Sequence, residues 1–422
     1  MPSRKRLAPW VAAFSVILGS FALAPPLFAA GSEKVLYNFC SAHQCTDGSG
    51  PASGLIFDQD GNLYGTTYNG GAGQSCESGC GTVFELIPSN DNWSEKVLHS
   101  FYPDGNGNYP ESTLMGDAFG NLYGTTYFSG PATSPGPGVV FELKRGAAGW
   151  TEHLLSSGDG NLAAGLIRDK RGNLYGTTQT GGAREGGDVF ELIYSNGRWT
   201  RKVLHSFCPA AHCSDGDWPE AGLIFDAAGN AYGTTYYGGV YGYGTVFELI
   251  RGNGRWIEKV LHSFNLDGKD GVNPSSRVIF DAAGNLYGTT QQGGTGAGGV
   301  VFELSPGPKG TWSRKILHNF LQNAGDGADP HAGLIFDKAG SLCGTTGQGG
   351  AYGYGTVFKL VSNNGKWTEG ILHSFGGAPD GALPFGDLIR DKAGNLYGTT
   401  AAGGANRSGC GLGCGTVFEI TP

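Results

Sequence analysis

The sequence GNLYGTT, or a close relative of it, occurs seven times along this chain of 422 residues. The Tyr positions of successive copies lie 52 to 59 residues apart, with Cys343 in place of Tyr in the sixth copy. A regular period of this length is typical of propellers and solenoids, in which one supersecondary unit is repeated. The repeat therefore constrains the architecture strongly and the chemistry weakly, because a residue that recurs in every unit is explained by building the unit.

Each unit contains four short apolar segments that are separated by turn residues. In the fourth unit these segments are 222–225, 231–235, 245–250 and 256–264. A DxxGN turn joins the first two, and a turn rich in Gly and Asn joins the last two; Asp bonds to the local backbone and Gly adopts positive φ in such turns. One unit therefore predicts four antiparallel strands.

The two ends of the chain carry complementary parts of one unit. KVLYNF at 34–39 matches the fourth segment KVLHSF at 96–101, whereas the last unit stops after its third segment, GTVFEI at 415–420. If the N-terminal strand pairs with the last unit, the ring closes and no strand edge stays open. The sequence therefore predicts an all-β, seven-bladed β-propeller with four antiparallel strands per blade, which forms a single domain over residues 31–422.

The first thirty residues have the pattern of a secretory signal peptide. Basic residues at 4–6 precede an apolar run from about 10 to 23 and the small residues Ala29 and Ala30. We therefore expect a cleaved signal at 1–30, a secreted or periplasmic location, and no stable membrane insertion after cleavage. A retained membrane anchor is the alternative.

Eight of the nine cysteines form close pairs, and export predicts that each pair is a local disulfide. The pairs are Cys40 with Cys45, Cys76 with Cys80, Cys208 with Cys213, and Cys410 with Cys414. Zinc is the alternative, because His43 and His212 lie within the first and third pairs, but the remaining ligands would have to come from elsewhere. Cys343 is predicted to be a small, buried apolar residue.

The repeats resemble those of the GloVer tandem-repeat proteins of bacterial exported proteomes, through the segments GLIFDxxGNLYGTT, GGxxGxGTVFEL and WxEKVLHSF. The unit is also similar to the NHL-type propeller repeat, in which a DxxGNxY segment joins the innermost strand to the next. That similarity implies that the GLIFD segments line the channel. The GloVer resemblance implies a fold and an exported location but no reaction. Members often carry a C-terminal surface-sorting segment, and the chain departs from this pattern at Pro422, which favours free secretion or the periplasm.

Residues that recur in all units are interpreted as structural. The Asp of each DxxG motif builds a turn, and the GTT hydroxyls bond to backbone groups or to neighbouring blades. Glu on the third strand is expected to pair with His on the fourth, as Glu248 and His262 would.

Candidate binding residues lie in two kinds of loop that are expected to open on the same face of the propeller. Loops on a rigid scaffold are where binding residues usually lie. The connection between units carries acidic turns, at Asp47, Asp104, Asp159, Asp215, Asp270, Asp326 and Asp380. The loop between the second and third strands carries aromatic residues, and Trp218, Tyr241 and Tyr352 complete the predicted binding surface. We expect the acidic turns to circle one mouth of the channel, where local turn capping, calcium binding and a catalytic carboxylate pair remain open.

The net charge and the absence of known catalytic motifs reduce the number of functions that the sequence supports. The chain has 28 Lys and Arg against 36 Asp and Glu, which argues against nucleic acid as a partner. No EF-hand, HExxH, GxSxG or phosphate-binding motif is present. We expect a monomeric binding or scaffold module without a cofactor, whose partner is a glycan, a peptide or a cell-envelope component. The alternative is a propeller enzyme, a lactonase, glycan lyase or hydrolase, with a carboxylate or metal site at the channel mouth.

Overall fold

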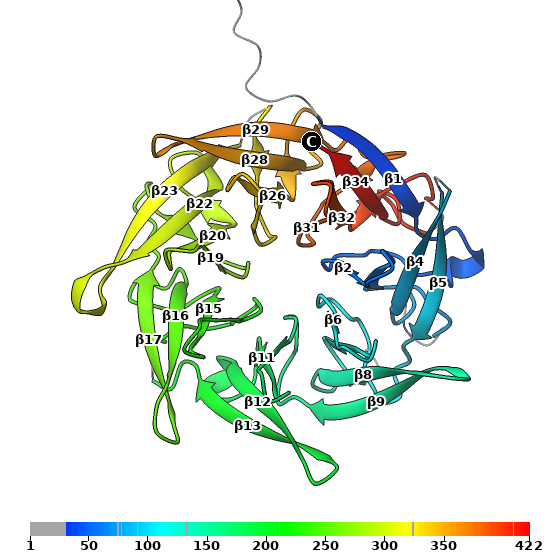
Figure 1. Ribbon diagram of the computed structural model, residues 1–422, viewed down its shortest axis with the longest axis horizontal. Helices are drawn as coiled ribbons and strands as arrows, with labels where there is room; N and C mark the ends of the chain where they lie inside the picture. The colour runs from blue at the N-terminus through cyan, green and yellow to red at the C-terminus, as the bar shows by residue number, and fades with distance from the viewer. Residues whose placement is uncertain are drawn as a thin grey trace, which may run out of the picture.

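The computed structural model describes residues 31–422 except 74, 75, 77, 91, 131–133, 211, 323, 324 and 408. Seven blades of four antiparallel strands are arranged in a ring around a central channel (Figure 1). The predicted β-propeller is confirmed. The predicted signal peptide at 1–30 lies outside the described residues.

The two inner strands of each blade carry the GLIFD and GNLYGTT segments. The innermost strands are β2 (Ile56–Phe57), β6 (Met115–Gly116), β10 (Ile167–Arg168), β14 (Ile224–Phe225), β19 (Ile279–Phe280), β25 (Ile335–Phe336) and β31 (Ile389–Arg390). The second strands are β3 (Leu63–Thr67), β7 (Leu122–Thr125), β11 (Leu174–Thr178), β15 (Ala231–Thr235), β20 (Leu286–Thr290), β26 (Leu342–Thr346) and β32 (Leu396–Thr400).

The two outer strands of each blade are longer. The third strands are β4 (Thr82–Ser89), β8 (Val139–Gly146), β12 (Asp188–Ser195), β16 (Thr245–Arg251), β22 (Ala297–Pro306), β28 (Thr356–Asn363) and β34 (Thr416–Thr421). The outermost strands are β5 (Asn92–Ser100), β9 (Gly149–Ser157), β13 (Arg198–Ser206), β17 (Trp256–Ser263), β23 (Trp312–Leu321), β29 (Lys366–Ser374) and β1 (Ser32–Asn38).

The loops contain short pairs of strands and single turns of 3-10 helix. The pairs are β18 (Gly271–Val272) with β21 (Gln292–Gly293), β24 (Gly327–Ala328) with β27 (Gln348–Gly349), and β30 (Gly381–Ala382) with β33 (Ala402–Gly403). The 3-10 turns are η1 (His43–Cys45), η2 (Ala183–Glu185) and η3 (Pro308–Gly310). Among the described residues, no helix has the length and apolar character that crossing a membrane requires.

The ring is closed by the N-terminal strand, as predicted. β1 lies antiparallel to β34, with Glu33 opposite Ile420 and Asn38 opposite Thr416 (Figure 1). Beyond the strand, Phe39 is fully buried and its ring packs edge-on against Phe84 of the first blade at 5.0 Å. Both ends of the chain therefore contribute to one blade and to the core beside it.

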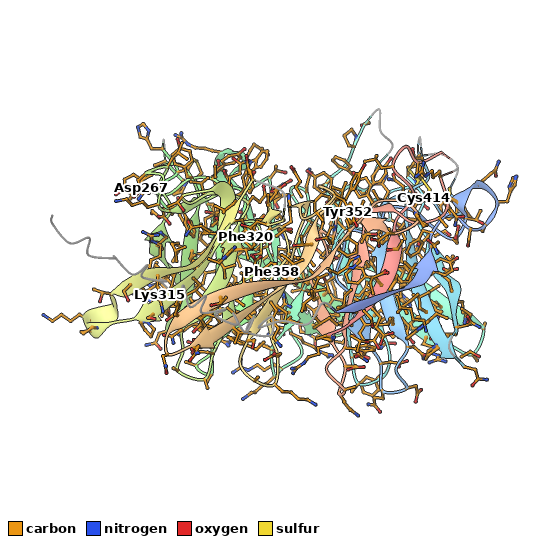
Figure 2. The ribbon with its side chains drawn as sticks, turned by 90° about the horizontal axis from the view of Figure 1, so that it is seen from above. Asp267, Lys315, Phe320, Tyr352, Phe358 and Cys414 are labelled. Atoms are coloured by element: carbon orange, nitrogen blue, oxygen red, sulfur yellow. A yellow bond between two sulfur atoms is a disulfide. The ribbon has the colours of Figure 1, made fainter. Side chains whose placement is uncertain are left out.

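The hydrophobic core is divided among the seams, which we define as the contacts between neighbouring blades. Between blades 5 and 6, Phe320 at the end of β23 packs against Phe358 of β28, with ring centroids 5.1 Å apart (Figure 2). A Cβ added to Gly344 of the GTT segment would lie 2.8 Å from the Phe358 ring. The Gly of GTT is therefore required because the next strand's Phe ring lies directly against the backbone.

The threonines that follow this glycine bond to backbone groups, as predicted. Thr234 Oγ1 donates to the carbonyl of Ser276 in the next blade at 3.0 Å, and Thr235 Oγ1 donates to the carbonyl of Tyr237 at 2.9 Å. These buried hydroxyls link the blades and hold the loops that follow the second strands.

Both kinds of loop open on one face, which we call the loop face. Asp267 lies in the connection between blades 4 and 5, and Tyr352 and Cys414 lie in loops between second and third strands. Figure 2 shows all three on the same side of the ring. This placement confirms the expected common face.

Candidate functional site at the central channel

The acidic turns lie in the seams and do not meet at the channel. Asp270 is buried, and it accepts hydrogen bonds from the Gly271 amide at 2.9 Å and from His262 Nε2 at 2.9 Å. Arg314 of the next blade forms an ion pair with it, with 3.2 Å between Arg314 Nη1 and Asp270 Oδ1. The other acidic turns likewise bond to their own turn or to an outermost strand.

None of the seven acidic turn residues lines the channel cavity among the residues that the structure describes. This corrects the expectation that Asp47, Asp104, Asp159, Asp215, Asp270, Asp326 and Asp380 circle the channel mouth. The physical reason is that each carboxylate is held by groups of its own turn, by a side chain on an outermost strand, or by both.

Five seams also bring a glutamate from the outermost strand of the next blade close to this Asp. Burial, followed by the charge of the neighbouring Asp, raises the pKa of Glu33 and Glu152 to about 7 and that of Glu95 to about 8. In two of these seams His, Asp and Glu atoms lie within 4.8 Å of one another, close enough to hold a cation. These sets are Glu33, His373, Asp380 and His318, Asp326, Glu369.

The predicted pairing of Glu248 with His262 is wrong. Glu248 lies opposite Tyr232 and accepts a hydrogen bond from its hydroxyl at 2.7 Å. His262 turns instead to Asp270 in the following loop. The β-bulge beside Val246 displaces the outermost strand, so that Glu248 lies opposite Lys259.

The three predicted aromatic residues lie apart from one another. Tyr241 and Tyr352 are exposed, and Trp218 packs edge-on against Tyr237 at 5.5 Å. Tyr352 lines a shallow groove of about 610 Å³ beside His373 and Asp380. They belong to three different loops, and within the described residues none of them lines the channel cavity.

The channel itself holds a cavity of about 520 Å³ that is not symmetric. Each blade contributes the residue three positions before the buried Leu or Val that leads into its innermost strand. In chain order these residues are Ala52, Glu111, Ala163, Glu220, Ser275, His331 and Phe385. Equivalent positions of a repeating structure therefore carry two acids, an imidazole and an aromatic ring, which is the kind of asymmetry that a specific site needs.

Two parallel rows of hydrogen bonds hold these groups in place. Tyr127 donates to Gln179 Oε1 at 2.7 Å, and Gln179 Nε2 donates to Glu220 Oε1 at 2.6 Å. The second row has the same order of hydrogen bonds, from Tyr to Gln to a residue of the lining, two blades further on. Tyr236 donates to Gln291 Oε1 at 3.0 Å, and Gln291 Nε2 lies 2.8 Å from His331 Nδ1.

The second row also determines the tautomer of the imidazole. Because the Gln291 amide donates to His331 Nδ1, the neutral imidazole carries its proton on Nε2. That nitrogen lies 3.3 Å from Asp329 Oδ2. His331 is therefore oriented from both sides, as a group that positions a ligand must be.

Glu111 and Glu220 interact electrostatically across the cavity. Burial raises the pKa of Glu111 to about 7, and the negative charge of Glu220 contributes to this rise. Burial also raises the pKa of Glu220, against the opposing effect of the Gln179 hydrogen bond. Glu111 belongs to neither row of hydrogen bonds, so near neutral pH this carboxyl can accept or donate a proton.

An ion pair between blades 5 and 7 also lines the cavity. Arg277 Nε of blade 5 lies 2.6 Å from Asp387 Oδ2 of blade 7. Asp387 Oδ1 also accepts from the Gly333 amide of blade 6 at 2.5 Å. This pair ties three blades together and neutralises its own charges, so that Glu111 and Glu220 dominate the charge of the cavity.

Sequence reasoning missed this site. We define the channel site as Glu111, Gln179, Glu220, Gln291 and His331, with Tyr127 and Tyr236 behind them. The sequence did contain an indication of the site: one position of the repeat is Ala or Ser in some units and Glu or His in others. A search for recurring residues passes over it.

The family model described as the Gloeobacter/Verrucomicrobia repeat matches residues 21–247, 132–325 and 222–422. No protein with a curated function matches the chain.

Solved structures show only distant similarity. A candidate 6-phosphogluconolactonase from Bacteroides uniformis is 13% identical with a TM-score of 0.49, covering 75% of this chain and 83% of its own. A candidate glucose dehydrogenase from Thermus thermophilus is 13% identical with a TM-score of 0.44, covering 92% of this chain and 99% of its own. A protein of unknown function from Dyadobacter fermentans is 11% identical with a TM-score of 0.46, covering 93% and 98%. At these values the chemistry of those proteins does not carry over to this chain.

Proposed function

Because the chain belongs to the Gloeobacter/Verrucomicrobia repeat family and its repeats enclose one asymmetric channel, we propose that it binds a small sugar or similar polyol at the channel site. The observation that carries this proposal is the convergence of Glu111, Glu220 and His331, which come from equivalent positions of three different blades. A cavity of about 520 Å³ is in the range typical of small-molecule sites.

The chemistry of the lining suits hydroxyl groups. A sugar hydroxyl both donates and accepts, and the carboxylates of Glu111 and Glu220 and the imidazole of His331 provide both kinds of partner. Phe385 packs edge-on against His331 with ring centroids 4.7 Å apart, which places an aromatic surface beside the polar groups. Such a surface can cover the apolar face of a sugar ring.

The charge of the site favours neutral or amino sugars over acidic ones. Glu111 and Glu220 already oppose each other's ionisation. A uronic acid or a phosphorylated sugar would add a third negative charge to a cavity with low solvent access, which costs free energy.

Acid–base catalysis is the second candidate, and one observation favours it. The pKa of Glu111 is raised to about 7, which suits a general acid or base at neutral pH, and Glu220, which lines the same cavity, is held by Gln179. In this case the ligand is also a substrate, and Glu111 exchanges a proton with it.

Export belongs to the same proposal. Four disulfides, Cys40–Cys45, Cys76–Cys80, Cys208–Cys213 and Cys410–Cys414, support folding in an oxidising compartment. A secreted or periplasmic protein would meet its sugar ligand, or a glycan that carries it, outside the cytoplasm.

The test is isothermal titration calorimetry with a panel of neutral sugars, amino sugars and uronic acids. We expect a ligand among the first two classes, and a loss of affinity of at least about tenfold in Glu220→Gln and in Gln179→Ala. The first variant removes the charge that accepts from a ligand hydroxyl, and the second removes the hydrogen bond that holds Glu220. Tyr352→Ala is the matched control, because this exposed aromatic residue lies on the loop face outside the channel cavity. Affinity that falls in Tyr352→Ala and not in Glu220→Gln would place binding on the loop face and contradict the proposal.

The same ligand separates binding from catalysis. Product formation that requires Glu111 and rises or falls with a midpoint near pH 7 supports the enzyme. A ligand recovered unchanged after prolonged incubation supports a binding module.

A further inference from the structure

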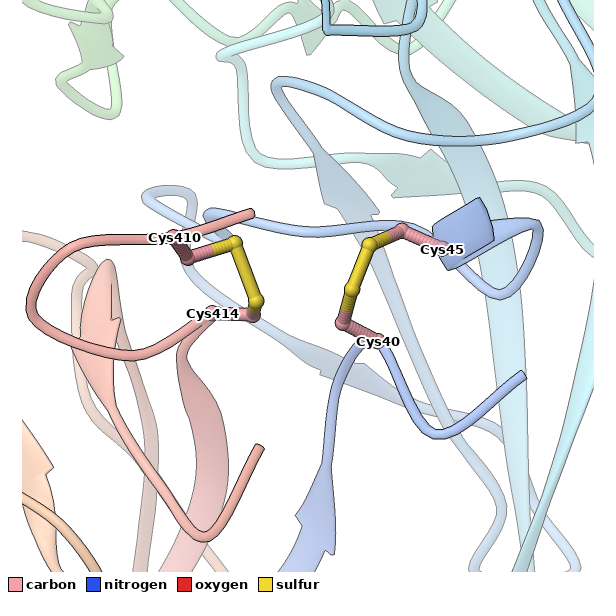
Figure 3. A group of neighbouring side chains, drawn as sticks. All are labelled: Cys40, Cys45, Cys410 and Cys414. Carbon is pink, nitrogen blue, oxygen red and sulfur yellow. A yellow bond between two sulfur atoms is a disulfide. The ribbon is translucent and has the colours of Figure 1, made fainter. Parts of the chain in front are cut away.

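The two disulfides nearest the ends of the chain lie against each other at the closing seam. Cys40 and Cys45 precede the first blade, and Cys410 and Cys414 lie in the loop between β32 and β34 of the last blade. Figure 3 shows the two S–S bonds side by side, and the four sulfur atoms lie within 4.8 Å of one another. Nearly the whole length of the chain separates the two pairs in the sequence.

From this cluster we propose that the reduced protein binds one zinc ion through Cys40, Cys45, Cys410 and Cys414. Structural zinc sites take four thiolates in a tetrahedron with Zn–S distances of about 2.3 Å, which places the sulfur atoms roughly 3.8 Å apart. The four sulfur atoms already lie within a volume of this size. To reach this geometry, the two sulfur atoms of each bonded pair must move apart to about 3.8 Å.

The backbone around the cluster is already joined across the seam. The Gly50 amide donates to the Cys414 carbonyl at 2.8 Å, and Asn406 Nδ2 donates to the Phe39 carbonyl at 3.0 Å. Cys414 and Cys40 are buried, and Cys45 and Cys410 are partly exposed. The site is therefore held from both ends of the chain and is accessible to a reductant and to the metal.

The sequence offered Cys40, Cys45 and His43 as zinc ligands but no further ligands near them. The structure provides these as Cys410 and Cys414, from the other end of the chain. His43, which the sequence offered as a ligand, is exposed and is not part of the cluster. The remaining pairs, Cys76–Cys80 and Cys208–Cys213, belong to no such group among the described residues.

Electrons and protons balance when the disulfide-bonded protein is converted to the reduced, zinc-bound protein. Each disulfide takes two electrons and two protons from a dithiol reductant, which is itself oxidised to a disulfide. Zinc then displaces four protons from the four thiols and forms four Zn–S bonds. A thiol oxidant reverses the sequence: two disulfides form and the ion is released. The ring is thereby clamped between its first and last blades when reduced, and each end is stiffened separately when oxidised.

The experiment measures metal content and geometry in the full chain, reduced with a phosphine in the absence of oxygen. We expect one zinc per chain after dialysis, by mass spectrometry of the metal, and intense visible bands of a tetrahedral cobalt thiolate centre when Co²⁺ replaces zinc. Cys410→Ser/Cys414→Ser should bind no zinc, whereas Cys76→Ser/Cys80→Ser should bind one, because it leaves the seam cluster intact.

Three results would overturn the proposal: no zinc in the reduced wild type, equal loss of zinc in both double variants, or cobalt spectra without thiolate bands. If circular dichroism shows that Cys410→Ser/Cys414→Ser does not fold, a chain with the seam cluster intact decides the matter alone. A mercurial thiol reagent is then titrated into a variant with Ser in place of Cys76, Cys80, Cys208 and Cys213, in which the four seam cysteines and the buried Cys343 remain. The ion should be released as four thiols react, and release that is complete after fewer thiols have reacted contradicts a four-cysteine site.

Discussion

At the residue scale, the sixth blade shows how two substitutions compensate each other. In the first blade the Tyr64 hydroxyl lies between two carboxylates, 2.7 Å from Glu85 Oε1 and 3.1 Å from Asp58 Oδ2, and its single proton is shared between them. The sixth blade has Cys343 in place of this Tyr and Lys359 in place of this Glu. Lys359 Nζ instead pairs with Asp337 at 2.8 Å. A cation thus replaces the hydroxyl as the partner of the turn.

We therefore predict that Lys359→Glu, which restores the residue of the other blades, destabilises the protein by about 1–3 kcal/mol. Asp337 and the new carboxylate would lie close together without a hydroxyl between them. The double variant Cys343→Tyr/Lys359→Glu should recover most of this loss. Free energies of unfolding from denaturant titration would measure the coupling, and equal values for the single and double variants would contradict the compensation.

At the scale of the element, β1 is the part of the chain on which ring closure depends. Without it β34 would be an open edge. The seam beside it would also lose the buried side chains of Leu36 and Phe39, each of which contributes about 1.5–3 kcal/mol. This seam has the same Phe–Phe contact as five of the other six seams, with ring centroids 5.0 Å apart between Phe39 and Phe84 and 5.2 Å between Phe264 and Phe302.

Removal of residues 31–39 is therefore expected to lower the melting temperature of the whole propeller, relative to a chain that begins at residue 31. A milder change tests the same seam. Phe39→Ala should cost about 3–5 kcal/mol, as for other buried Phe, whereas Phe119→Ala should stay within about 0.5 kcal/mol, because Phe119 is 85% exposed. An unchanged melting temperature after the deletion would refute the closure argument.

At the scale of the whole molecule, every seam places a titratable or charged residue of an outermost strand near the Asp of an acidic turn. Five of them contain a glutamate whose pKa is raised to about 7 or 8, mainly by burial: Glu33, Glu95, Glu152, Glu258 and Glu369. In the other two seams Arg201 and Arg314 occupy the equivalent position and pair with Asp159 and Asp270. The ring as a whole therefore binds more protons near pH 6 than its unfolded chain does.

This difference predicts that stability decreases as the pH rises from about 5 to 8. A group with a raised folded pKa contributes its full stability below the unfolded value of 4.5, and that contribution is lost as the pH rises through the folded value. Each proton bound in excess by the folded state contributes a slope of about 1.4 kcal/mol per pH unit. His99 acts in the opposite sense, because burial lowers its pKa to about 4, but it is one group against these five glutamates and Glu111, whose pKa is also raised to about 7.

Melting temperatures measured between pH 5 and 8 check this prediction. Glu95→Gln should flatten the profile, since it removes the group with the highest of these pKa values. Asp60→Asn is the matched control, because it changes an exposed carboxylate and should leave the slope as it is. A stability that rises from pH 5 to 8 would contradict the assignment.

Local sequence patterns were sufficient to predict the blade, the number of blades and the closing strand. The reason is that each depends on local patterns: the DxxG turn, the strand alternation and the match between KVLYNF and KVLHSF recur within a unit and can be compared along the chain. The four cysteine pairs belong to the same class, since their partners are five residues apart or fewer.

Only the tertiary structure decided which residues meet across blades. Glu111 and Glu220 lie 109 positions apart in the sequence, and Cys40 and Cys410 lie at opposite ends, so that no local pattern relates them. The acidic turns were predicted at the channel mouth because their connections open on the loop face, but the structure holds their carboxylates in the seams. Function in a ring of similar units depends on where the units differ, and the closed ring determines which of those differences face the same space.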